Sequence, residues 1–271
     1  MPVAHLEDRA VIAVAGPESR SFLQGLITND VLRLKPGTGL YAALLTPQGK
    51  ILFDFFLVEG DGAILIDCLA ASRDAFLKRL MMYKLRSKLT LSTSDHLAVL
   101  SEWDGEAARN AISYPDPRLA ELGNRAIIAK GEMRNNLPGA SAYHSRRRAL
   151  AVPEGDDFGS DRIFALDGDL DELHAVDFDK GCYVGQELTA RMKHRGTARK
   201  RVLAIEAKTG VLPAAGTSVK AGATDIGEIV SGYGESGFAL IRLDRLEHSG
   251  TTALTAGDGM VVLIKPSWLF P

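Results

Sequence analysis

Cysteine is scarce in this sequence, and that scarcity limits the thiol chemistry open to the chain. The 271 residues include two cysteines, Cys68 and Cys182, which cannot form the disulfide framework of a small secreted domain. Cys68 lies in the apolar run from Ile64 to Leu69, so we predict that it is a buried core thiol. Any reactive thiol must then be Cys182.

Long apolar runs and an excess of one charge are also absent. No apolar run approaches the ~18 residues of a membrane-spanning helix, and the net charge of −2 argues against a nucleic-acid binder that acts through overall charge. The N-terminal sequence Met-Pro-Val-Ala-His-Leu-Glu-Asp is neither a signal peptide nor an Arg-rich transit peptide. Because 46% of the residues are hydrophobic and 24% are charged, we expect a globular, cytoplasmic protein with no membrane partner.

Charge is nevertheless distributed unevenly along the chain. Residues 154–179 carry ten acids and one arginine, whereas residues 191–201 carry six lysines and arginines, one histidine and no acid. Such blocks are usually solvated faces. The alternative for the basic block is a surface that binds an anionic ligand or the tail of one.

The first half of the chain predicts a mixture of strands and helices. Strands are predicted at residues 10–15, 40–45, 50–58, 63–69, 89–93, 96–100 and 126–130. Helices are predicted from Pro17, from Ser72 to about Arg86 with Phe76, Leu77, Leu80 and Met81 inward, and over residues 105–112. The order of strand, helix, polar break and strand recurs over residues 96–130, which hints at an internal duplication. Hairpins among the strands indicate an α+β fold rather than a doubly wound sheet.

The pattern changes after Arg199, where short strands alternate with glycine-rich turns and no helix is predicted. The predicted strands span residues 201–206, 218–220, 225–231, 238–243 and 260–265. This spacing indicates a small β-barrel, with the apolar residues Pro266–Pro271 folded back as a plug. We therefore predict two domains, residues 1–197 and residues 198–271.

The segment from Asp179 to Gly196 contains the cysteine of most interest. Cys182 is flanked by glycines, and a helical pattern follows it, which Gly196 is suited to end because glycine tolerates the left-handed conformation. The pattern places an apolar pair and a charged stripe at four-residue spacing, namely Leu188 and Met192, and Glu187, Arg191 and Arg195.

Two physical effects would favour a thiolate at Cys182. A helix start carries partial positive charge, and Lys180 could add a full charge. The alternative is that Cys182 is a small apolar filler and that Gly181 and Gly185 only shape a turn. The residues alone leave both interpretations open.

Four motifs of this chain resemble those of a known family. Residues 180–187, Lys-Gly-Cys-Tyr-Val-Gly-Gln-Glu, match the signature K-G-C-[YF]-x-G-Q-E of the YgfZ family of folate-binding proteins, relatives of the aminomethyltransferase (T-protein) of the glycine cleavage system. Residues 22–30 and 45–52 resemble its first two motifs, and Arg147 with residues 152–155 resembles the third. The sequence Leu-Thr-Ala-Arg-Met-Lys-His-Arg-Gly after the signature looks most like the mitochondrial-type branch, whose members help to mature iron–sulfur proteins.

The resemblance implies a folate-binding α+β domain followed by a β-barrel, arranged around a channel that holds tetrahydrofolate. It makes Cys182 the functional thiol with Lys180 beside it. The other signature-loop residues are Gly181, Tyr183, Gly185, Gln186 and Glu187. The implied folate contacts are Asn29, Asp54, Arg147, Arg191, Arg195 and Arg199. For Asp54, a solvent-facing strand position is the alternative to a pterin contact.

The chain departs from the family pattern near its third motif. Relatives often carry a glutamate two residues after the arginine that matches Arg147, where it suits a hydrogen bond to the pterin ring. This chain has Ala149 there, and Ala151 replaces the usual glycine. Pterin recognition by that route is therefore weakened.

The main hypothesis is a tetrahydrofolate-binding accessory factor for iron–sulfur cluster assembly or repair, without turnover of its own. Clusters are generally held by about four cysteines, so Cys182 could supply one ligand of a transient cluster shared with a partner. The expected partners of this monomer are folate and an A-type iron–sulfur carrier or client iron–sulfur enzymes.

Two alternatives belong to other functional classes. A folate-dependent aminomethyltransferase would need a carboxylate such as Asp54, but its chemistry has no use for Cys182. A nucleic-acid-binding module could use Arg146–Arg148 and residues 191–201, but no aromatic residues accompany these arginines and the net charge is negative. We therefore expect no nucleic-acid partner.

Overall fold

The structure is a computed structural model that describes residues 3–103, 110–196 and 199–270. Contacts group the chain into two compact units, each made of segments that are distant in sequence. The first unit contains Met1–Leu45, Leu52–Arg146 and Leu173–Val184, and the second contains Thr46–Ile51, Arg147–Glu172 and Gly185–Pro271. The predicted domain boundary after residue 197 stays a prediction.

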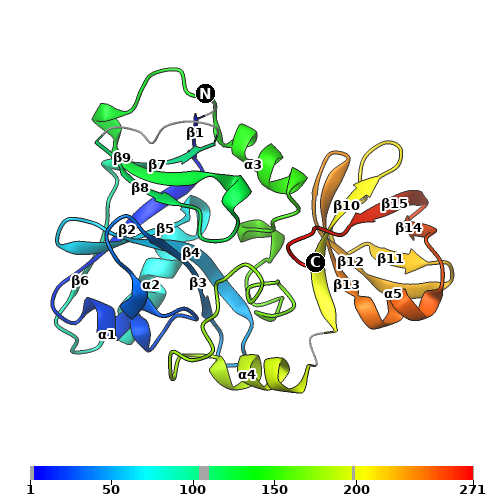
Figure 1. Ribbon diagram of the computed structural model, residues 1–271, viewed down its shortest axis with the longest axis horizontal. Helices are drawn as coiled ribbons and strands as arrows, with labels where there is room; N and C mark the ends of the chain where they lie inside the picture. The colour runs from blue at the N-terminus through cyan, green and yellow to red at the C-terminus, as the bar shows by residue number, and fades with distance from the viewer. Residues whose placement is uncertain (1–2, 104–109, 197–198, 271) are drawn as a thin grey trace. The chain divides into compact units, whose positions relative to one another are not determined.

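A five-stranded sheet with the strand order β3-β4-β5-β2-β6 is the base of the first unit (Figure 1). Its strands are β2 (Arg9–Ala15), β3 (Gly39–Leu45), β4 (Ile51–Glu59), β5 (Ala63–Leu69) and β6 (Thr90–Thr93). β4 and β5 form the predicted hairpin, in which Phe55 pairs with Cys68. β2 pairs antiparallel with both β5 and β6. All five predicted strands of this region are confirmed.

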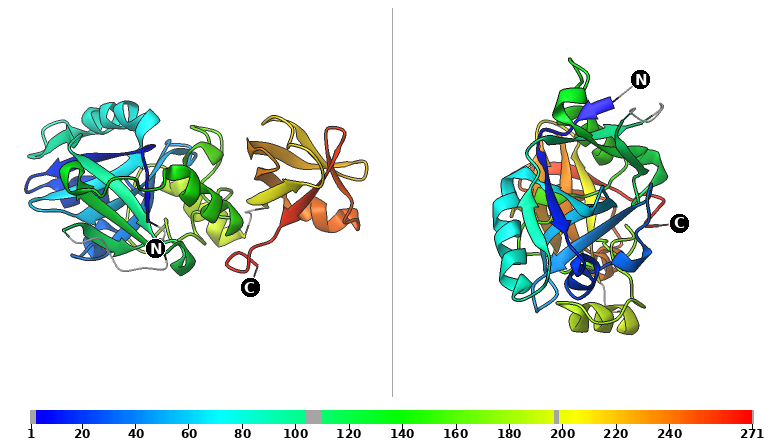
Figure 2. Two further views of the ribbon diagram at one scale, coloured as in Figure 1. Left: turned by 90° about the horizontal axis from the view of Figure 1, so that it is seen from above. Right: turned by 90° about the vertical axis from the view of Figure 1, so that its left-hand side faces the viewer.

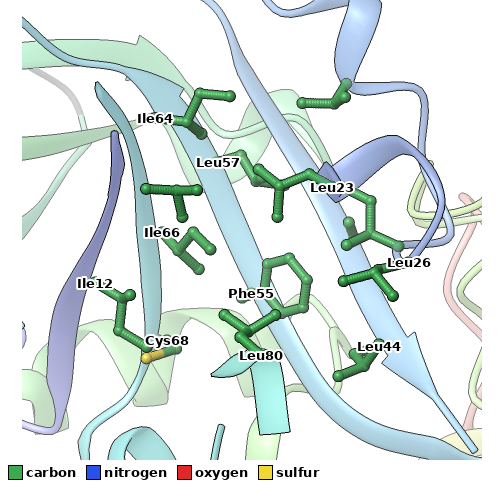
Figure 3. Packing of buried hydrophobic residues seen from close by; sticks show 14 of the residues in the cluster. Ile12, Leu23, Leu26, Leu44, Phe55, Leu57, Ile64, Ile66, Cys68 and Leu80 are labelled. Carbon is green, nitrogen blue, oxygen red and sulfur yellow. The ribbon is translucent and has the colours of Figure 1, made fainter. Parts of the chain in front are cut away.

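Alternate residues of this sheet face a hydrophobic core, as the two-residue period of a strand requires. Two helices, α1 (Ser19–Gln24) and α2 (Arg73–Lys84), cover that face. The core includes Ile12, Leu23, Leu26, Leu44, Phe55, Leu57, Ile64, Ile66, Cys68 and Leu80 (Figure 3). Cys68 is 1% exposed, which confirms the predicted core thiol.

Two details of the predicted helices are wrong. α1 begins at Ser19 rather than at Pro17. Gly16 adopts a φ of +122° and its carbonyl accepts a hydrogen bond from Ser19 Oγ, so the chain turns before the helix starts. In α2, Met81 is 51% exposed rather than buried. It follows the buried Leu80 and is therefore rotated by about 100° away from the core-facing side.

A second sheet of the first unit has the strand order β1-β7-β9-β8. Its strands are β1 (Val3–His5), β7 (Leu97–Glu102), β8 (Ile112–Pro115) and β9 (Asn124–Ala129). β7 and β9 confirm the strands predicted there. Of the helix predicted over residues 105–112, residues 105–109 lie outside the described residues, and Ile112 begins a strand instead. The hint of an internal duplication stays a prediction.

Short helical segments connect these elements. Helix α3 (Ala140–Ala149) follows the second sheet. Single turns of 3-10 helix occur at Val31–Arg33, Ala70–Ser72, Ala120–Leu122, Lys130–Glu132 and Gly155–Asp157. No helix of the described residues has the length and apolar character needed to cross a membrane.

The second unit contains a closed barrel with the strand order β10-β13-β12-β11-β14-β15 (Figure 2). Its elements are β10 (Lys200–Ala207), β11 (Ser218–Ala221), β12 (Thr224–Tyr233), β13 (Ser236–Arg242), β14 (Leu254–Ala256) and β15 (Gly259–Ile264), with helix α4 (Gln186–Arg195) before them. The α+β class and the C-terminal barrel are therefore confirmed. Leu269 and Phe270 pack against the barrel core, as the predicted plug requires.

The barrel region also contains a helix that the sequence analysis did not predict. Helix α5 (Leu243–Ser249) lies between β13 and β14, and Leu243 and Leu246 pack against the barrel core. Gly250, with a φ of +62°, ends it. Two leucines three residues apart are the only helical signal in so short a segment, which explains the omission.

Candidate functional site

Cys182 is exposed and lies in a loop before α4. The helix begins only at Gln186, because Gly185 adopts a left-handed φ of +84°. The prediction that Cys182 feels the first turn of a helix is therefore wrong, since the effect of the helix dipole falls off within that turn. Gly181 also has a positive φ, +92°, so both flanking glycines occupy conformations that other residues rarely adopt.

Lys180 holds the signature loop to the end of α1. Its Nζ donates hydrogen bonds to the carbonyl oxygens of Gln24 at 2.8 Å and Ile27 at 2.5 Å, and the Gln24 side chain donates to the Lys180 carbonyl oxygen. Nζ also lies 5.1 Å from the centre of the Tyr183 ring. Burial lowers the pKa of Lys180 to about 8. No hydrogen bond or ion pair of the described residues joins Lys180 to Cys182, and the hydrogen bonds that its ammonium group donates go to the backbone of the first motif.

The loop after α1 is part of the same support. Thr28 Oγ1 donates to the Ala175 carbonyl oxygen at 2.6 Å, and Asn29 Nδ2 donates to the carbonyl oxygens of Tyr41 and His174, both at 2.8 Å. Both side chains are buried. Asn29, a predicted folate contact, therefore uses its amide donors to anchor the chain that leads into the signature.

The part of the signature that follows Cys182 packs against the second of the four motifs, residues 45–52. The contact lies within the second unit, between Gly49 and the start of α4. Gly49 has a φ of +82°, and a Cβ added there would lie 3.3 Å from both the Gly185 carbonyl oxygen and the Leu188 Cβ. Thr189, which is buried, donates its hydroxyl to the Gly185 carbonyl oxygen at 3.1 Å. Glycine at position 49 thus permits the close approach of the turn to the start of α4.

The rest of α4 carries the predicted charged stripe. Glu187, Arg191 and Arg195 are exposed, as is Arg199, which follows the helix. Gln186 lies at the first helical position and is half-buried. The helix ends at Gly196 in the left-handed conformation, with a φ of +57°, which confirms the predicted stop.

The acidic and basic blocks partly neutralise each other. Arg201 forms ion pairs with Asp171 at 2.7 Å and Asp169 at 3.5 Å, and Lys193 lies 3.4 Å from Asp171. Half of the acidic block is buried, namely Glu154, Asp157, Asp167, Asp169 and Asp177. Burial raises the pKa of Asp169 well above its usual value and that of Asp167 to about 6. The interpretation of this block as a solvated face is wrong for these five residues.

Asp54 is buried, so the solvent-facing alternative is wrong. The side chain is on β4 and accepts a hydrogen bond from Tyr41 Oη at 2.8 Å. It lies on the sheet face opposite the core described above, because its neighbour Phe55 points into that core.

That opposite face carries a network of buried charges that the sequence analysis missed. Asp67 accepts hydrogen bonds from Arg9 at 2.6 Å and from Arg125 at 2.5 Å. The Arg125 guanidinium carbon lies 3.9 Å from the centre of the Phe56 ring. Arg118 pairs with Asp116 at 2.7 Å, stacks on Tyr41 and Phe56, and donates to Tyr143 Oη at 2.6 Å. The sequence did carry a signal for this network, because charged residues stand singly inside apolar strands. Such residues are rarely buried without a partner.

Arg147 is also buried, in the second unit. Its Nη1 donates to Asp157 Oδ2 at 2.6 Å and to the Val152 carbonyl oxygen at 3.0 Å. Asp157 accepts further hydrogen bonds from the hydroxyls of Ser231 and Tyr233 on β12. The third motif is thus tied to the barrel through Arg147, while Ala149 is exposed.

The described residues contain no group of three or more histidine, cysteine and acidic side chains that could hold a metal ion. Burial raises the pKa of Cys68 to about 12, so its thiol stays protonated at neutral pH. Cys182 is therefore the accessible thiol of the pair.

Comparisons with known proteins agree with the architecture. Residues 199–271 match the family described as CAF17, C-terminal beta-barrel domain. The crystal structure of the glycine cleavage system aminomethyltransferase T from Bartonella henselae has a TM-score of 0.75 to this chain, covers 100% of it and 86% of the other chain, and is 16% identical. That likeness confirms the predicted T-protein-like fold, and at this identity it shows the fold alone.

Relatives found by sequence share a higher identity with this chain than that crystal structure does. The chain is 31% identical to the iron–sulfur cluster assembly factor IBA57, mitochondrial, of Mus musculus, over 97% of this chain and 84% of the mouse protein. It is 34% identical to the mitochondrial IBA57 homologue of Neurospora crassa, over 73% of this chain and 52% of that protein, about half its length. The predicted cytoplasmic location is wrong on this evidence, because both relatives are named mitochondrial proteins. From the identity and coverage of the mouse relative, the chain belongs to the IBA57 family of iron–sulfur cluster assembly factors.

Proposed function

We propose that this chain is an accessory factor in the assembly or repair of iron–sulfur clusters in client enzymes, with Cys182 as its functional thiol. The names of its relatives support the general role. The observation that carries the proposal is an exposed cysteine in a loop whose neighbouring residues are firmly held. The protein has no turnover of its own in this role.

The cysteine count determines how Cys182 takes part. An iron–sulfur cluster is generally bound by about four cysteine thiolates. Cys68 is buried and stays protonated, so this chain contributes a single thiolate. The remaining ligands come from a partner, for which an A-type iron–sulfur carrier or a client enzyme suits the chemistry. The cluster is then cargo that the two proteins share during transfer.

The loop geometry suits such sharing. Lys180 and the buried Tyr183 fix the loop on either side of Cys182, whereas the thiol itself remains exposed to a partner. A Cβ added at Gly181 would meet no atom within 4 Å, so the surroundings of that glycine are open. A fixed, uncrowded thiol needs little reorganisation before it binds a cluster.

The proposal is tested by Cys182→Ala in a strain that lacks the native gene. We expect the variant to fold but to lose rescue of iron–sulfur enzyme activity, because no other accessible cysteine can replace the ligand. Cys68→Ala is the matched control, and should retain rescue despite losing about 1 kcal/mol of stability from a small cavity. Full rescue by Cys182→Ala would contradict the role of the thiol.

A transferase role is tested separately. The purified protein would be incubated with aminomethyl-loaded lipoyl carrier protein and tetrahydrofolate, and methylenetetrahydrofolate would be measured. We expect no turnover. Turnover that Asp54→Asn abolishes would instead establish an aminomethyltransferase, in which a carboxylate orients the folate nitrogen.

Tetrahydrofolate binding is a further part of the proposal, and the predicted contacts fit it unequally. Asn29 and Arg147 already donate to carbonyl and carboxylate oxygens, and Ala149 provides no hydrogen bond. Asp54 keeps a buried carboxylate next to Tyr41. The exposed Arg191, Arg195 and Arg199 suit the carboxylates of a polyglutamate tail.

The tail contact predicts a difference between two forms of folate. Replacing Arg195 and Arg199 with glutamate should weaken the binding of polyglutamylated tetrahydrofolate by roughly tenfold or more. The binding of the monoglutamate form should weaken by much less. Titration by calorimetry would measure both. Lys208 and Lys220, exposed cations of the barrel region, provide a control with the same charge change. Equal weakening of the two folates would contradict the tail contact.

A further inference from the structure

The C-terminal end of α2 presents an apolar surface to solvent. Met81 is 51% exposed, Met82 62% and Leu85 86%, and the three residues lie within five positions of the chain. The opposite side of the helix, with Phe76 and Leu80, is packed in the core. α2 therefore buries one apolar side and exposes another. The helix is drawn in cyan in Figure 2.

Leu85, directly after α2, has an unusual backbone conformation. Its φ of +45° and ψ of −110° lie in a region that bulky residues rarely adopt. Glycine or asparagine is usual where a helix ends in a positive φ. Here a leucine occupies the position, with its side chain in solvent rather than in a core.

Positive charge predominates around the apolar residues, although the Glu18 carboxylate accepts a hydrogen bond from the backbone N–H of Lys88 at 3.0 Å. Between Ala75 and Ser94 the sequence contains no aspartate or glutamate. The cations of this stretch are Lys78, Arg79, Lys84, Arg86 and Lys88. In the part of the chain that the structure describes, none of these side chains forms an ion pair or a hydrogen bond to a carboxylate. We call this surface, formed by these five cations with Met81, Met82 and Leu85, the basic–apolar end of α2.

Two kinds of partner could cover such a surface. Protein interfaces are enriched in aromatic residues, methionine and arginine at their centre and depleted of lysine. The basic–apolar end of α2 has two methionines and two arginines, but it also has three lysines and none of its three apolar residues is aromatic. An interfacial membrane-binding helix combines a few inserted aliphatic side chains with a surrounding set of lysines and arginines that meet anionic headgroups. The long stem of Lys78 lets its ammonium reach the headgroups from among the apolar residues.

We propose that the basic–apolar end of α2 binds peripherally to the surface of an anionic lipid bilayer. Met82 and Leu85 enter the boundary between headgroups and acyl chains, and the five cations contact lipid phosphates. This mode needs no helix that crosses the bilayer, and none of the helices in the described ranges is long and apolar enough to do so. The proposal does not depend on the role of Cys182, since α2 and the thiol are tested by different variants.

The test is co-flotation of the full-length protein with vesicles. One set contains phosphatidylcholine alone, and the other contains about one third phosphatidylglycerol. We expect binding to the anionic vesicles, little binding to the neutral vesicles, and a loss of binding as salt screens the charges. Lys84→Gln with Arg86→Gln should lower the partition coefficient by roughly 25-fold, since each cation contributes about fivefold. Leu85→Ser should lower it by roughly tenfold.

Matched controls separate the surface from general effects. Lys208→Gln with Lys220→Gln removes the same charge from the other unit, and Val211→Ser removes an apolar side chain that is 72% exposed. Both should bind vesicles as the unmodified protein does. Circular dichroism and thermal unfolding check that each variant folds.

Three results would overturn the proposal. The first is equal binding of neutral and anionic vesicles, and the second is α2 variants that bind vesicles like the controls. The third is no vesicle binding at all. If the third result comes with loss of iron–sulfur enzyme rescue in the α2 variants, the surface is assigned to an acidic protein partner instead of a lipid.

Discussion

At the scale of single residues, Lys180 shows how a partly buried cation can hold an exposed thiol in place. Its ammonium group is hydrogen-bonded to the carbonyl oxygen of Gln24, the last residue of α1, and to that of Ile27 in the loop that follows. The first of these bonds satisfies an acceptor that a helix terminus leaves unpaired. Burial lowers the pKa of Lys180 to about 8. The charged lysine is thus disfavoured by burial even though its hydrogen bonds fix the signature loop.

This pKa predicts a specific pH dependence of stability. The unfolded lysine keeps its proton up to the ordinary pKa of 10.5, whereas the folded one releases it near pH 8. Between these values the unfolded state binds more protons, so the free energy of unfolding rises with pH. Relative to Lys180→Met, the unmodified protein should gain about 1–2 kcal/mol between pH 8 and pH 10.5, after allowance for solvent screening. Urea unfolding of both proteins would measure the difference, and parallel pH curves would contradict it.

At the scale of elements, the start of α4 depends on one glycine. Gly185 has a φ of +84° and immediately precedes the helix, so the chain turns sharply between Tyr183 and Gln186. The buried Tyr183 lies before this turn and the exposed stripe of α4 after it. A side chain at position 185 would be strained whatever the surrounding space.

Gly185→Ala should therefore destabilise the protein by about 1–2 kcal/mol, through strain at a positive φ. Gly131→Ala is a suitable control, because that glycine lacks a positive φ and an added Cβ would meet no atom within 4 Å. The control should change stability by less than about 0.5 kcal/mol. Chemical denaturation would compare the two, and equal effects would show that the conformation of Gly185 is not required.

At the scale of the whole molecule, charge and aromatic stacking bind the two sheets of the first unit together. Arg9 and Asp67 come from the five-stranded sheet, and Arg125 comes from β9 of the other sheet. All three side chains are almost completely shielded from water. A buried ion pair adds little net stability, but removing one partner leaves the other charge buried and unpaired.

Asp67→Asn should accordingly cost about 3–5 kcal/mol in the free energy of unfolding, because the buried guanidinium groups of Arg9 and Arg125 both lose a close carboxylate and Arg125 keeps Asp116 only at 3.9 Å. Asp161→Asn removes a carboxylate that is 62% exposed and lies 3.9 Å from Lys50 Nζ, and should be nearly neutral. Thermal and denaturant unfolding of both variants would establish the contrast. A loss below about 1 kcal/mol for Asp67→Asn would show that the network is not a structural joint.

Much of this molecule could be predicted before its structure was known. Strand periodicity located β2 to β6 and five of the six barrel strands, since alternating burial leaves a direct trace in the sequence. The signature motif identified Cys182, and glycine chemistry placed the end of α4 at Gly196. The short α5 and the exposed Met81 were missed, because a few residues carry too little periodic signal to fix a helix or its orientation.

The sequence by itself determined most of the strands, the family and the single candidate thiol, because these depend on local patterns and on residue counts. Tertiary structure decided what the charged residues do. It paired Lys180 with carbonyls 153 and 156 residues away, buried Asp54 and Asp67, and joined Arg147 to Asp157. Such partners are brought together only when distant segments pack, so the local sequence around each charge cannot identify them.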